Sequence, residues 1–177
     1  MRSFIVTGAS ACGKTTLVNE AQRRGYIHLP THTTRAKRSG EIAGVHNEFL
    51  TLDEFKSNFS VNMYLEPSLK YAENIGVFYG TPRSWLQSLS HDGYCATPIT
   101  PLIARRICAS TNVLWICLIC SEEVRRQRLA ERNINDEEIE ARIRTIEDQY
   151  DLPETTLIFD TTNLLPSQIF TKIAGLL

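Results

Sequence analysis

The hydrophobic pattern alternates short apolar runs with longer mixed segments. Residues 3–8 (SFIVTG), 112–119 (NVLWICLI) and 155–162 (TTLIFDTT) are apolar and rich in β-branched residues, which is typical of strands buried on both faces of a parallel sheet. The mixed segments predict helices at 14–24, 83–90, 101–109, 121–133, 136–150 and 166–176. Strands that alternate with helices in this way predict a three-layer α/β domain.

Residues 30–84 have a different pattern. They are polar and turn-rich, with scattered aromatic residues that follow no helical period, which predicts a small lobe of short strands and turns. At 177 residues the chain fits a single domain. We expect its core to comprise 1–29, 85–120 and 151–177, with the lobe at 30–84 and a separate helical region at 121–150.

Composition narrows the possible partners. The chain is 42% apolar and 22% charged, with a net charge of -1, so it lacks the basicity expected of a nucleic-acid-binding protein. Its longest apolar run, 113–120, is far shorter than the roughly 20 residues that span a bilayer. The few residues before the first strand are too short for a signal peptide. These features predict a cytoplasmic protein, monomeric or homodimeric, with no nucleic-acid or membrane partner.

The cysteines and histidines indicate no metal site. Cys117 and Cys120 form a C-x-x-C pair, but no second pair stands at zinc-finger spacing and both lie in an apolar run. We therefore expect them to act as small apolar side chains in a buried strand. The histidines at 28, 32, 46 and 91 show no metal-ligand spacing, and we assign them no role.

Residues 8–15 (GASACGKT) carry the clearest chemical motif, G-x-x-x-x-G-K-[ST]. A buried strand precedes the motif and a helix follows it, as a phosphate-binding P-loop requires. Glycines let the backbone curl around an anion, and the helix N-terminus adds a positive dipole. Lys14 would reach the β- and γ-phosphates of ATP and act in catalysis, and Thr15 would bind Mg²⁺. The predicted nucleotide-binding set is Gly8, Ala11, Cys12, Gly13, Lys14, Thr15 and Thr16.

A second phosphate site is predicted at 31–49 (THTTRAKRSGEIAGVHNEF). Arg35, Lys37 and Arg38 cluster beside threonine hydroxyls in a turn-rich segment, and arginine suits bidentate contacts with phosphate. Taken alone, such a segment is more often a solvated basic loop. After a P-loop, a site for the phosphate acceptor is the better interpretation.

This segment resembles the one with which guanylate kinases bind a nucleoside monophosphate, S-x-T-T-R-x-x-R-x-G-E-x-x-G-x-x-Y-x-F. The positions in step are Thr33, Thr34, Arg35, Arg38, Gly40, Glu41, Gly44 and Phe49. Residues 51–57 (TLDEFKS) and 72–83 (AENIGVFYGTPR) resemble the segments that follow in that family. The resemblance covers the P-loop and the whole lobe, and more loosely the C-terminal half.

The resemblance implies a three-layer P-loop kinase fold with a parallel central sheet, a small β-rich lobe for the nucleoside monophosphate and a helical lid at 121–150. Arg35, Arg38 and Tyr79 would hold the phosphate of the acceptor, and Thr31 and Thr81 would face its base.

Two departures from the family pattern fall in the acceptor lobe. Asn47 stands where the family has a tyrosine that contacts the acceptor phosphate. The family glutamate that reads guanine aligns with Lys70, or with Glu66 if about four residues are inserted. We include all three residues in the predicted acceptor site.

A third departure follows residue 95. Guanylate kinases usually carry L-D-I-D there, with aspartates that serve guanine and the metal, whereas this chain has no acidic residue between Asp92 and Glu122. Thr100, Asp92 or a water are the candidates to replace the missing acids.

The region 121–150 is rich in arginine. Glu122 and Arg125 are three residues apart, which predicts ion pairing on a helix surface. In guanylate kinases, R-L-x-x-R and a later arginine close over the transferring phosphoryl group, which implies that Arg128, Arg132 and Arg142 are catalytic. Residues 159–163 (FDTTN) lie where that family contacts adenine, although a simple turn at a strand end is an equal alternative.

The expected activity is ATP-dependent phosphorylation of a nucleoside monophosphate. GMP or dGMP is the leading acceptor, and the departures make a different or modified nucleotide a competitor. A kinase similar to ribose 1,5-bisphosphate phosphokinase and a non-catalytic guanylate-kinase-like binding module are the alternatives. A P-loop GTPase is disfavoured because the chain has neither N-K-x-D nor D-x-x-G.

Overall fold

The computed structural model describes residues 1–65, 76–98, 100–132, 134–144, 152–173 and 175–176. Its central sheet has five parallel strands. In spatial order they are β2 (Ile27–Leu29), β6 (Tyr94–Ala96), β1 (Phe4–Thr7), β7 (Leu114–Ile119) and β8 (Leu157–Asp160). β1, β7 and β8 confirm the three predicted strands. β2 and β6 have only three residues each, too few for a recognisable hydrophobic pattern.

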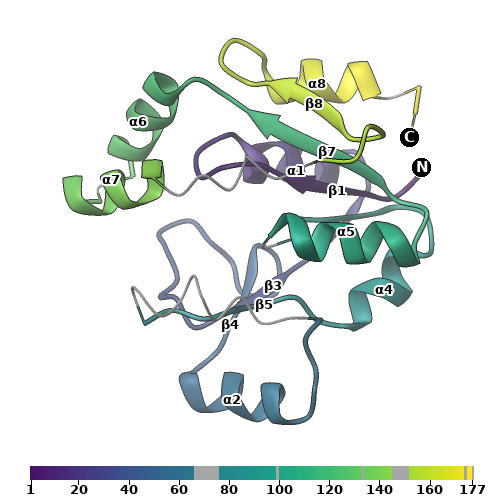
Figure 1. Cartoon of the computed structure of the whole chain (residues 1–177), viewed down its shortest axis with the longest axis vertical. Helices are drawn as coiled ribbons and strands as arrows, with labels where there is room; N and C mark the ends of the chain where they lie inside the picture. Colours follow the sequence, from purple (N-terminus) through teal and green to yellow (C-terminus); the bar gives the residue numbers. More distant parts are fainter. Residues whose placement is uncertain (66–75, 99, 133, 145–151, 174, 177) are drawn as a thin grey trace.

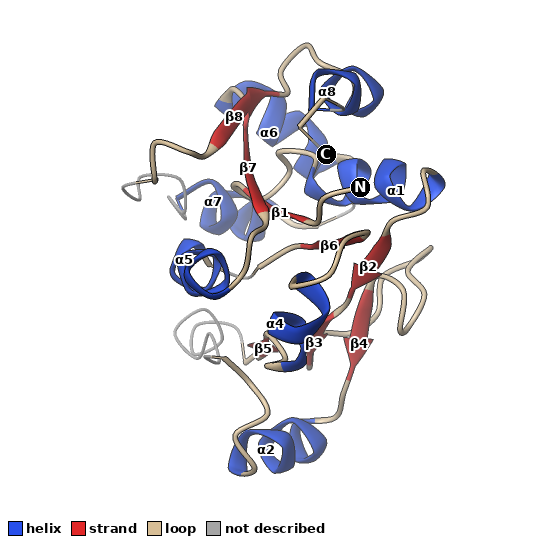
Figure 2. Ribbon diagram, turned by 90° about the vertical axis from the view of Figure 1, so that its right-hand side faces the viewer, coloured by secondary structure: helices blue, strands red, loops and turns tan. Residues whose placement is uncertain are grey.

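Helices cover both faces of this sheet, which confirms the three-layer α/β fold (Figures 1 and 2). α1 (Lys14–Arg23) and α8 (Pro166–Ile173) lie on one face, and α4 (Ser84–Leu89) and α5 (Pro101–Ser110) lie on the other. Successive residues of β1 supply the two cores in turn, because side chains of a strand alternate between faces. Phe4 and Val6 pack toward α1 and α8, whereas Ile5 packs toward α4 and α5.

Aromatic residues anchor both cores. On the α1 side, Phe4, Tyr26 and Phe170 meet edge to face, with ring centroids 5.1 to 6.2 Å apart. On the other side, the buried Trp115 donates a hydrogen bond from Nε1 to Oγ1 of Thr7 at 2.8 Å. Since Thr7 is the last residue of β1, this bond fixes the strand end from which the glycine-rich loop departs.

The lobe carries a second sheet in the order β4–β3–β5, formed by β3 (Thr31–Thr33), β4 (Asn47–Phe49) and β5 (Tyr79–Gly80). It also contains a helix, α2 (Leu52–Ser60), so the prediction of strands and turns alone is wrong there. α2 begins with a capping box in which the Thr51 side chain accepts from the Glu54 N–H and the Glu54 side chain accepts from the Thr51 N–H. The T-x-x-E spacing was the available signal.

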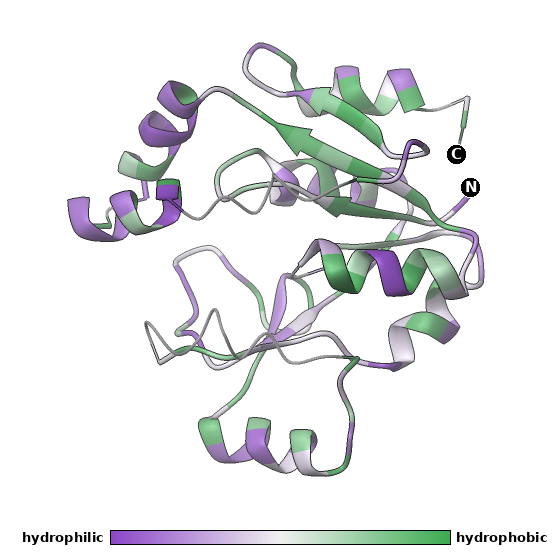
Figure 3. Cartoon of the chain, in the orientation of Figure 1, coloured by the Kyte–Doolittle hydropathy of each residue, from purple (hydrophilic) through white to green (hydrophobic). Residues whose placement is uncertain are grey.

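Helices α6 (Glu122–Ala130) and α7 (Asp136–Arg144) follow β7 and form the predicted lid region. Both are strongly polar, in contrast to the hydrophobic central strands (Figure 3). Leu129 of α6 and Ile139 and Ile143 of α7 pack on Ala11 of the glycine-rich loop. The predicted extension of the second helix to residue 150 falls on 145–151, outside the described residues. Among the described residues, no helix has the length and apolar character needed to cross a membrane.

Candidate active site

The glycine-rich loop between β1 and α1 has a backbone that glycine makes possible. Gly8 has φ +134°, and a Cβ there would lie 2.1 Å from the carbonyl oxygen of Leu118. Gly13 immediately precedes α1 with φ +92°, and Ala11 also has positive φ, at 70°. Turns of this kind direct backbone N–H groups to one side, where they bind anions together with the helix N-terminus.

Residues distant in sequence support this loop from outside. Thr161, just after β8, donates from Oγ1 to the Cys12 carbonyl at 3.0 Å. Arg128 of α6 donates to the carbonyls of Ala11, at 3.1 Å, and Thr161, at 2.8 Å. Arg125 donates to the Ser10 carbonyl at 3.2 Å. Three consecutive loop carbonyls, those of Ser10, Ala11 and Cys12, are thereby fixed by side chains from outside the loop.

Lys14 points back along its own loop. Its Nζ donates to the carbonyls of Gly8 and Ala9, the latter at 2.8 Å. The adjacent Thr15 is exposed, and both residues line the cavities above the loop. Phosphate oxygens can replace carbonyl oxygens as acceptors for the ammonium group, so this position suits the predicted phosphate role.

A cavity of about 210 Å³ brings together the three predicted parts of the site. The P-loop contributes Lys14 and Thr15, the acceptor lobe contributes Arg35, Arg38, Asn47 and Tyr79, and the lid contributes Arg132 and Arg142. Glu41 is its acidic member. A cavity lined by five cationic side chains and one carboxylate is suited to bind polyphosphate.

The arginines of this cavity repel one another. The pKa of Arg38 is lowered, first by burial and then by the charges of Arg35 and Arg142. The pKa of Arg132 is lowered by desolvation and then by Arg38, Arg142 and Arg35. Arginine stays protonated nonetheless. The positive charges in the cavity therefore repel one another, and a bound anion would reduce this repulsion.

Glu41 organises the acceptor side, a role the sequence analysis did not assign although the residue lies in the quoted motif. Its carboxylate accepts two hydrogen bonds from Arg35, at 2.8 and 2.9 Å, and one from the Arg38 N–H at 2.8 Å. Burial by itself would raise the pKa of Glu41, but these bonds outweigh it and lower the pKa. Arg35 also lies 5.5 Å from the centre of the Phe49 ring, so it is held from two sides.

The three predicted lid arginines separate into two groups. Arg132 and Arg142 line the 210 Å³ cavity, where Arg142 pairs with Glu138 and donates to Ser10 Oγ at 3.3 Å. Arg128 is not among the residues that line it. Arg128 supports the P-loop carbonyls and lines a neighbouring cleft of about 450 Å³ with Thr16, Thr161 and Leu165. Arg132 lines both cavities. Thr161 belongs to the segment that the sequence analysis linked to adenine.

The expected surface ion pair between Glu122 and Arg125 is wrong. Glu122 pairs with Arg126, at 2.8 Å, one residue further along α6. Arg125 turns inward to the Ser10 carbonyl and also donates to the Arg142 carbonyl at 2.9 Å. The i,i+4 pair forms on the solvent side, which leaves Arg125 to connect the lid helices to the P-loop.

The predicted base-reading residues are only partly assembled. Thr31 lines a cavity of about 220 Å³ beside the first one and donates to the Thr97 carbonyl at 3.4 Å. Thr81 is fully buried, lines none of the described cavities, and its hydroxyl has no hydrogen-bond partner within the described part of the chain. Burial therefore argues against direct contact of Thr81 with a ligand in this conformation. Glu66 and Lys70 lie outside the described residues.

The structure also limits what replaces the missing aspartates. Asp92 precedes β6, whereas the P-loop follows the parallel strand β1. Asp92 is therefore at the opposite end of the sheet from the loop. Thr100 caps α5 and accepts from the Ile103 N–H at 3.3 Å. The residues after β6 that do line the 220 Å³ cavity are Thr97 and Pro98.

The expectation of two cysteines in a buried strand holds for Cys117, which is buried in β7. Cys120 follows the end of β7 and is only partly buried, and its sulfur lies 3.4 Å from that of Cys12 at the core on the α1 side. Within the described ranges, no three His, Cys, Asp or Glu side chains gather in a way that could hold a metal ion.

A parallel sheet with a P-loop after its central strand, facing an arginine-rich lobe, is the architecture of a P-loop kinase fold. The guanylate kinase family profile matches residues 1–165. The chain belongs to the guanylate kinase family.

Individual relatives agree with this assignment. A guanylate kinase of Neisseria gonorrhoeae is 40% identical over 93 residues, which cover 51% of this chain and 43% of that protein. The match thus spans less than half the length of that relative. Among solved structures, a guanylate kinase from Anaplasma phagocytophilum has the same fold, with a TM-score of 0.65, 22% identity and coverage of 99% of this chain and 84% of that one. A gluconokinase from Sinorhizobium meliloti has a TM-score of 0.54 at 16% identity, over 99% of this chain and 91% of that one.

Proposed function

We propose that this protein transfers the γ-phosphoryl group of ATP to the phosphate of a nucleoside monophosphate, with GMP or dGMP as the leading acceptor. The observation that carries the proposal is the 210 Å³ cavity, in which P-loop, lobe and lid side chains converge. A site that binds a single phosphate needs only one set of these cationic side chains, either that of the P-loop or that of the lobe. Two phosphate-binding elements that face each other across one cavity suit a transfer between two phosphates.

In this mechanism Lys14 and the loop N–H groups hold the ATP phosphates. Arg35, Arg38 and Tyr79 bind the phosphate of the acceptor, and Arg132 and Arg142 stabilise the charge shared in the transition state. Arg128 acts indirectly, because its contacts with Ala11 and Thr161 keep the loop in shape. No general base is needed, since the attacking phosphate oxygen is already anionic at neutral pH.

The residues present are compatible with Mg²⁺ bound together with the nucleotide. The exposed hydroxyl of Thr15 lines the cavity with Lys14, and Mg²⁺ usually keeps several waters and binds substrate phosphates with few protein ligands. Thr15 would hold the ion, which would supply charge neutralisation at the ATP phosphates.

Two other functions remain as alternatives. A sugar-phosphate kinase of the ribose 1,5-bisphosphate phosphokinase type would bind phosphate with the same side chains, but its acceptor would have no base to recognise. A non-catalytic binding module would bind ligands without transfer. The intact Lys14 and Thr15 and the assembled cavity favour catalysis over the module.

The test is ADP production from ATP–Mg²⁺ against all common NMPs and dNMPs and ribose 1,5-bisphosphate, with Lys14→Ala as the blank. We expect strong turnover of a purine monophosphate. Turnover of the sugar phosphate with no dependence on a base would replace the proposal by the sugar-phosphate kinase. ATP binding without transfer to any acceptor would favour the binding module.

A further inference from the structure

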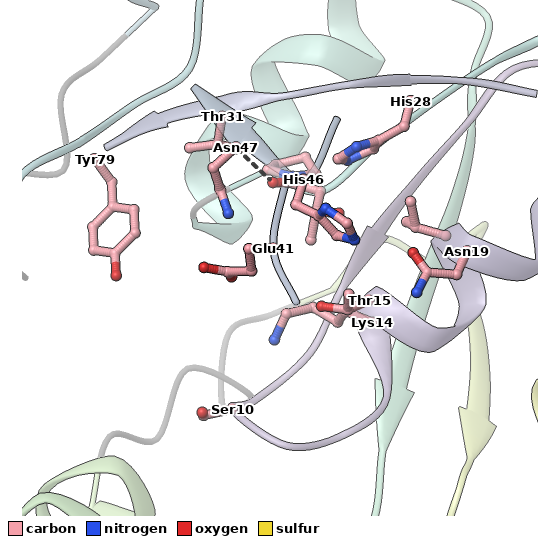
Figure 4. Close-up of a pocket in the computed structure, with 13 residues that line it drawn as sticks. Ser10, Lys14, Thr15, Asn19, His28, Thr31, Glu41, His46, Asn47 and Tyr79 are labelled. Atoms are coloured by element: carbon pink, nitrogen blue, oxygen red, sulfur yellow. Dashed lines mark hydrogen bonds between the residues drawn. The ribbon is translucent and has the colours of Figure 1, made fainter. Parts of the chain in front are cut away.

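The 220 Å³ cavity extends beyond the 210 Å³ phosphate cavity to residues with no role in the mechanism above. It shares Lys14, Thr15, Asn47 and Tyr79 with the phosphate cavity and is also lined by His28, His46 and Asn19. These three come from β2, from the loop before β4, and from α1. Figure 4 shows the two imidazole rings side by side, on the opposite side of the cavity from Tyr79.

The hydrogen bonds of the two rings define their tautomers. His28 Nδ1 lies 2.7 Å from the Val45 carbonyl oxygen, which can only accept, so Nδ1 carries the hydrogen. In the neutral ring Nε2 of His28 is then an acceptor. His46 Nδ1 accepts from the Ile42 N–H at 3.0 Å, so in the neutral ring its hydrogen is on Nε2, which is a donor. The backbone contacts thus leave Nε2 as an acceptor in His28 and as a donor in the neighbouring His46.

The neutral form of His28 is the one its surroundings favour. Burial lowers the pKa of His28 and outweighs the Val45 hydrogen bond, which raises it; the nearby His46 adds a smaller lowering effect. A neutral His28 keeps its acceptor at Nε2, so the cavity wall presents one acceptor beside one donor.

We propose that His28 and His46 form an acceptor–donor pair that recognises the lactam edge of a 6-oxopurine base in the acceptor nucleotide. The N1–H of the base would donate to His28 Nε2, and O6 would accept from His46 Nε2–H. This proposal rests on the proposed function, because it takes the base to belong to the nucleotide whose phosphate Arg35 and Arg38 bind. It gives the chain, which has no acid between Asp92 and Glu122, a neutral acceptor for N1–H.

A consequence is a defined selectivity. AMP presents a donor at N6 and an acceptor at N1, the reverse order, and would leave both ring nitrogens mismatched. A mismatch of hydrogen-bonding groups that a bound base would cover discriminates strongly, so we expect GMP to exceed AMP in kcat/KM by about 100-fold or more. IMP has the same lactam edge as GMP and is expected to stay within about tenfold of it.

Two variants test the pair while keeping the loop in place. An asparagine side chain reaches as far as Nδ1 of histidine, so His28→Asn can still donate to Val45 and His46→Asn can still accept from Ile42. Each removes Cε1 and Nε2 of the ring, and with Nε2 the atom to which the proposal assigns the contact with the base. His91→Asn, an exposed position at the other end of β6, is the matched control.

We expect each variant to raise the KM for GMP by about 10- to 100-fold, to leave the KM for ATP within about twofold, and to reduce the preference for GMP over AMP. His91→Asn should change none of these values. Unchanged GMP affinity and unchanged selectivity in both variants would overturn the proposal, as would a wild-type preference for AMP.

Calorimetric titration of GMP without ATP separates this inference from the proposed function. Binding of GMP that His28→Asn and His46→Asn weaken, but no turnover, supports the pair and overturns the kinase activity. Turnover of GMP by the wild type, with GMP binding unchanged in both variants, supports the kinase activity and overturns the pair. Absence of both binding and turnover overturns both.

Discussion

The two sides of the candidate active site are held in different ways. The P-loop is fixed by the core: Gly8 lies against the Leu118 backbone of β7, and Arg128 and Thr161 bind the loop carbonyls. The strands of the acceptor lobe have only two or three residues each. The lobe relies on side-chain contacts such as the Arg35–Glu41 pair and the stacked rings of Phe55 and Tyr64, 4.8 Å apart.

This difference explains where the chain departs from its family. A nest of backbone N–H groups depends on loop shape, so the four residues between Gly8 and Gly13 can vary as long as the shape persists. Recognition of the acceptor depends on individual side chains. We therefore expect Asn47, in place of the family tyrosine, to alter the contact with the acceptor phosphate without a change in the fold.

The largest expected effect is on the P-loop side. Lys14→Ala should lower kcat/KM by about 100- to 1,000-fold, the range seen when one preorganised donor to transition-state charge is removed. Stability should change little, since the ammonium group contacts carbonyls of its own loop. Steady-state kinetics together with thermal unfolding test this. Normal turnover in the variant would refute the phosphate role of the loop.

The next effect concerns the loop backbone itself. Gly8→Ala should destabilise the fold by about 3 kcal/mol or more, since the new Cβ meets the Leu118 carbonyl and the φ of +134° is strained. Gly13→Ala is the matched control: its φ is also positive, but nothing lies within 4 Å of the added atom. We expect it to cost only about 1–2 kcal/mol. Denaturant unfolding measures both, and equal losses would mean that the contact with β7 does not fix the loop.

On the acceptor side, Arg38→Ala should raise the KM for the acceptor by about 10- to 100-fold, the range for one hydrogen bond to a charged group. The KM for ATP should change less. Lys37→Ala is the control, because Lys37 is an exposed basic neighbour that lines none of the described cavities. Equal losses for ATP and acceptor in Arg38→Ala would contradict the separation into two sites.

The P-loop and the acceptor lobe also differ in how much of each could be predicted from the sequence. The P-loop and the long strands were predictable because their signals are local: spaced glycines, and apolar runs flanked by helices. The partners of Arg128 were not, since Ala11 and Thr161 lie 117 and 33 residues away along the chain. Spacing on a helix indicates only neighbours on that helix, and for Arg125 it suggested an ion pair that does not form.

In the acceptor lobe, the sequence indicated some residues of the site but not others. The resemblance indicated Arg35, Arg38 and Tyr79 as a group, and the cavity brings them together. It did not indicate His28 and His46, because their relevance depends on hydrogen bonds to the Val45 carbonyl and the Ile42 N–H. Thr81 had the right residue type for a base contact, but its burial could not be read from the sequence.

The smallest expected effect tests whether the acceptor lobe is indeed stabilised locally. Thr51→Ala removes the capping box at the start of α2 and should reduce stability by about 1 kcal/mol. Thr51→Ser keeps the hydroxyl and should restore most of the loss. Because α2 packs within the lobe through Phe55, the KM for the acceptor should rise modestly while the KM for ATP stays constant. If both KM values rise together, the lobe and the P-loop are mechanically coupled, and the contrast between a core-held loop and a locally held lobe is wrong.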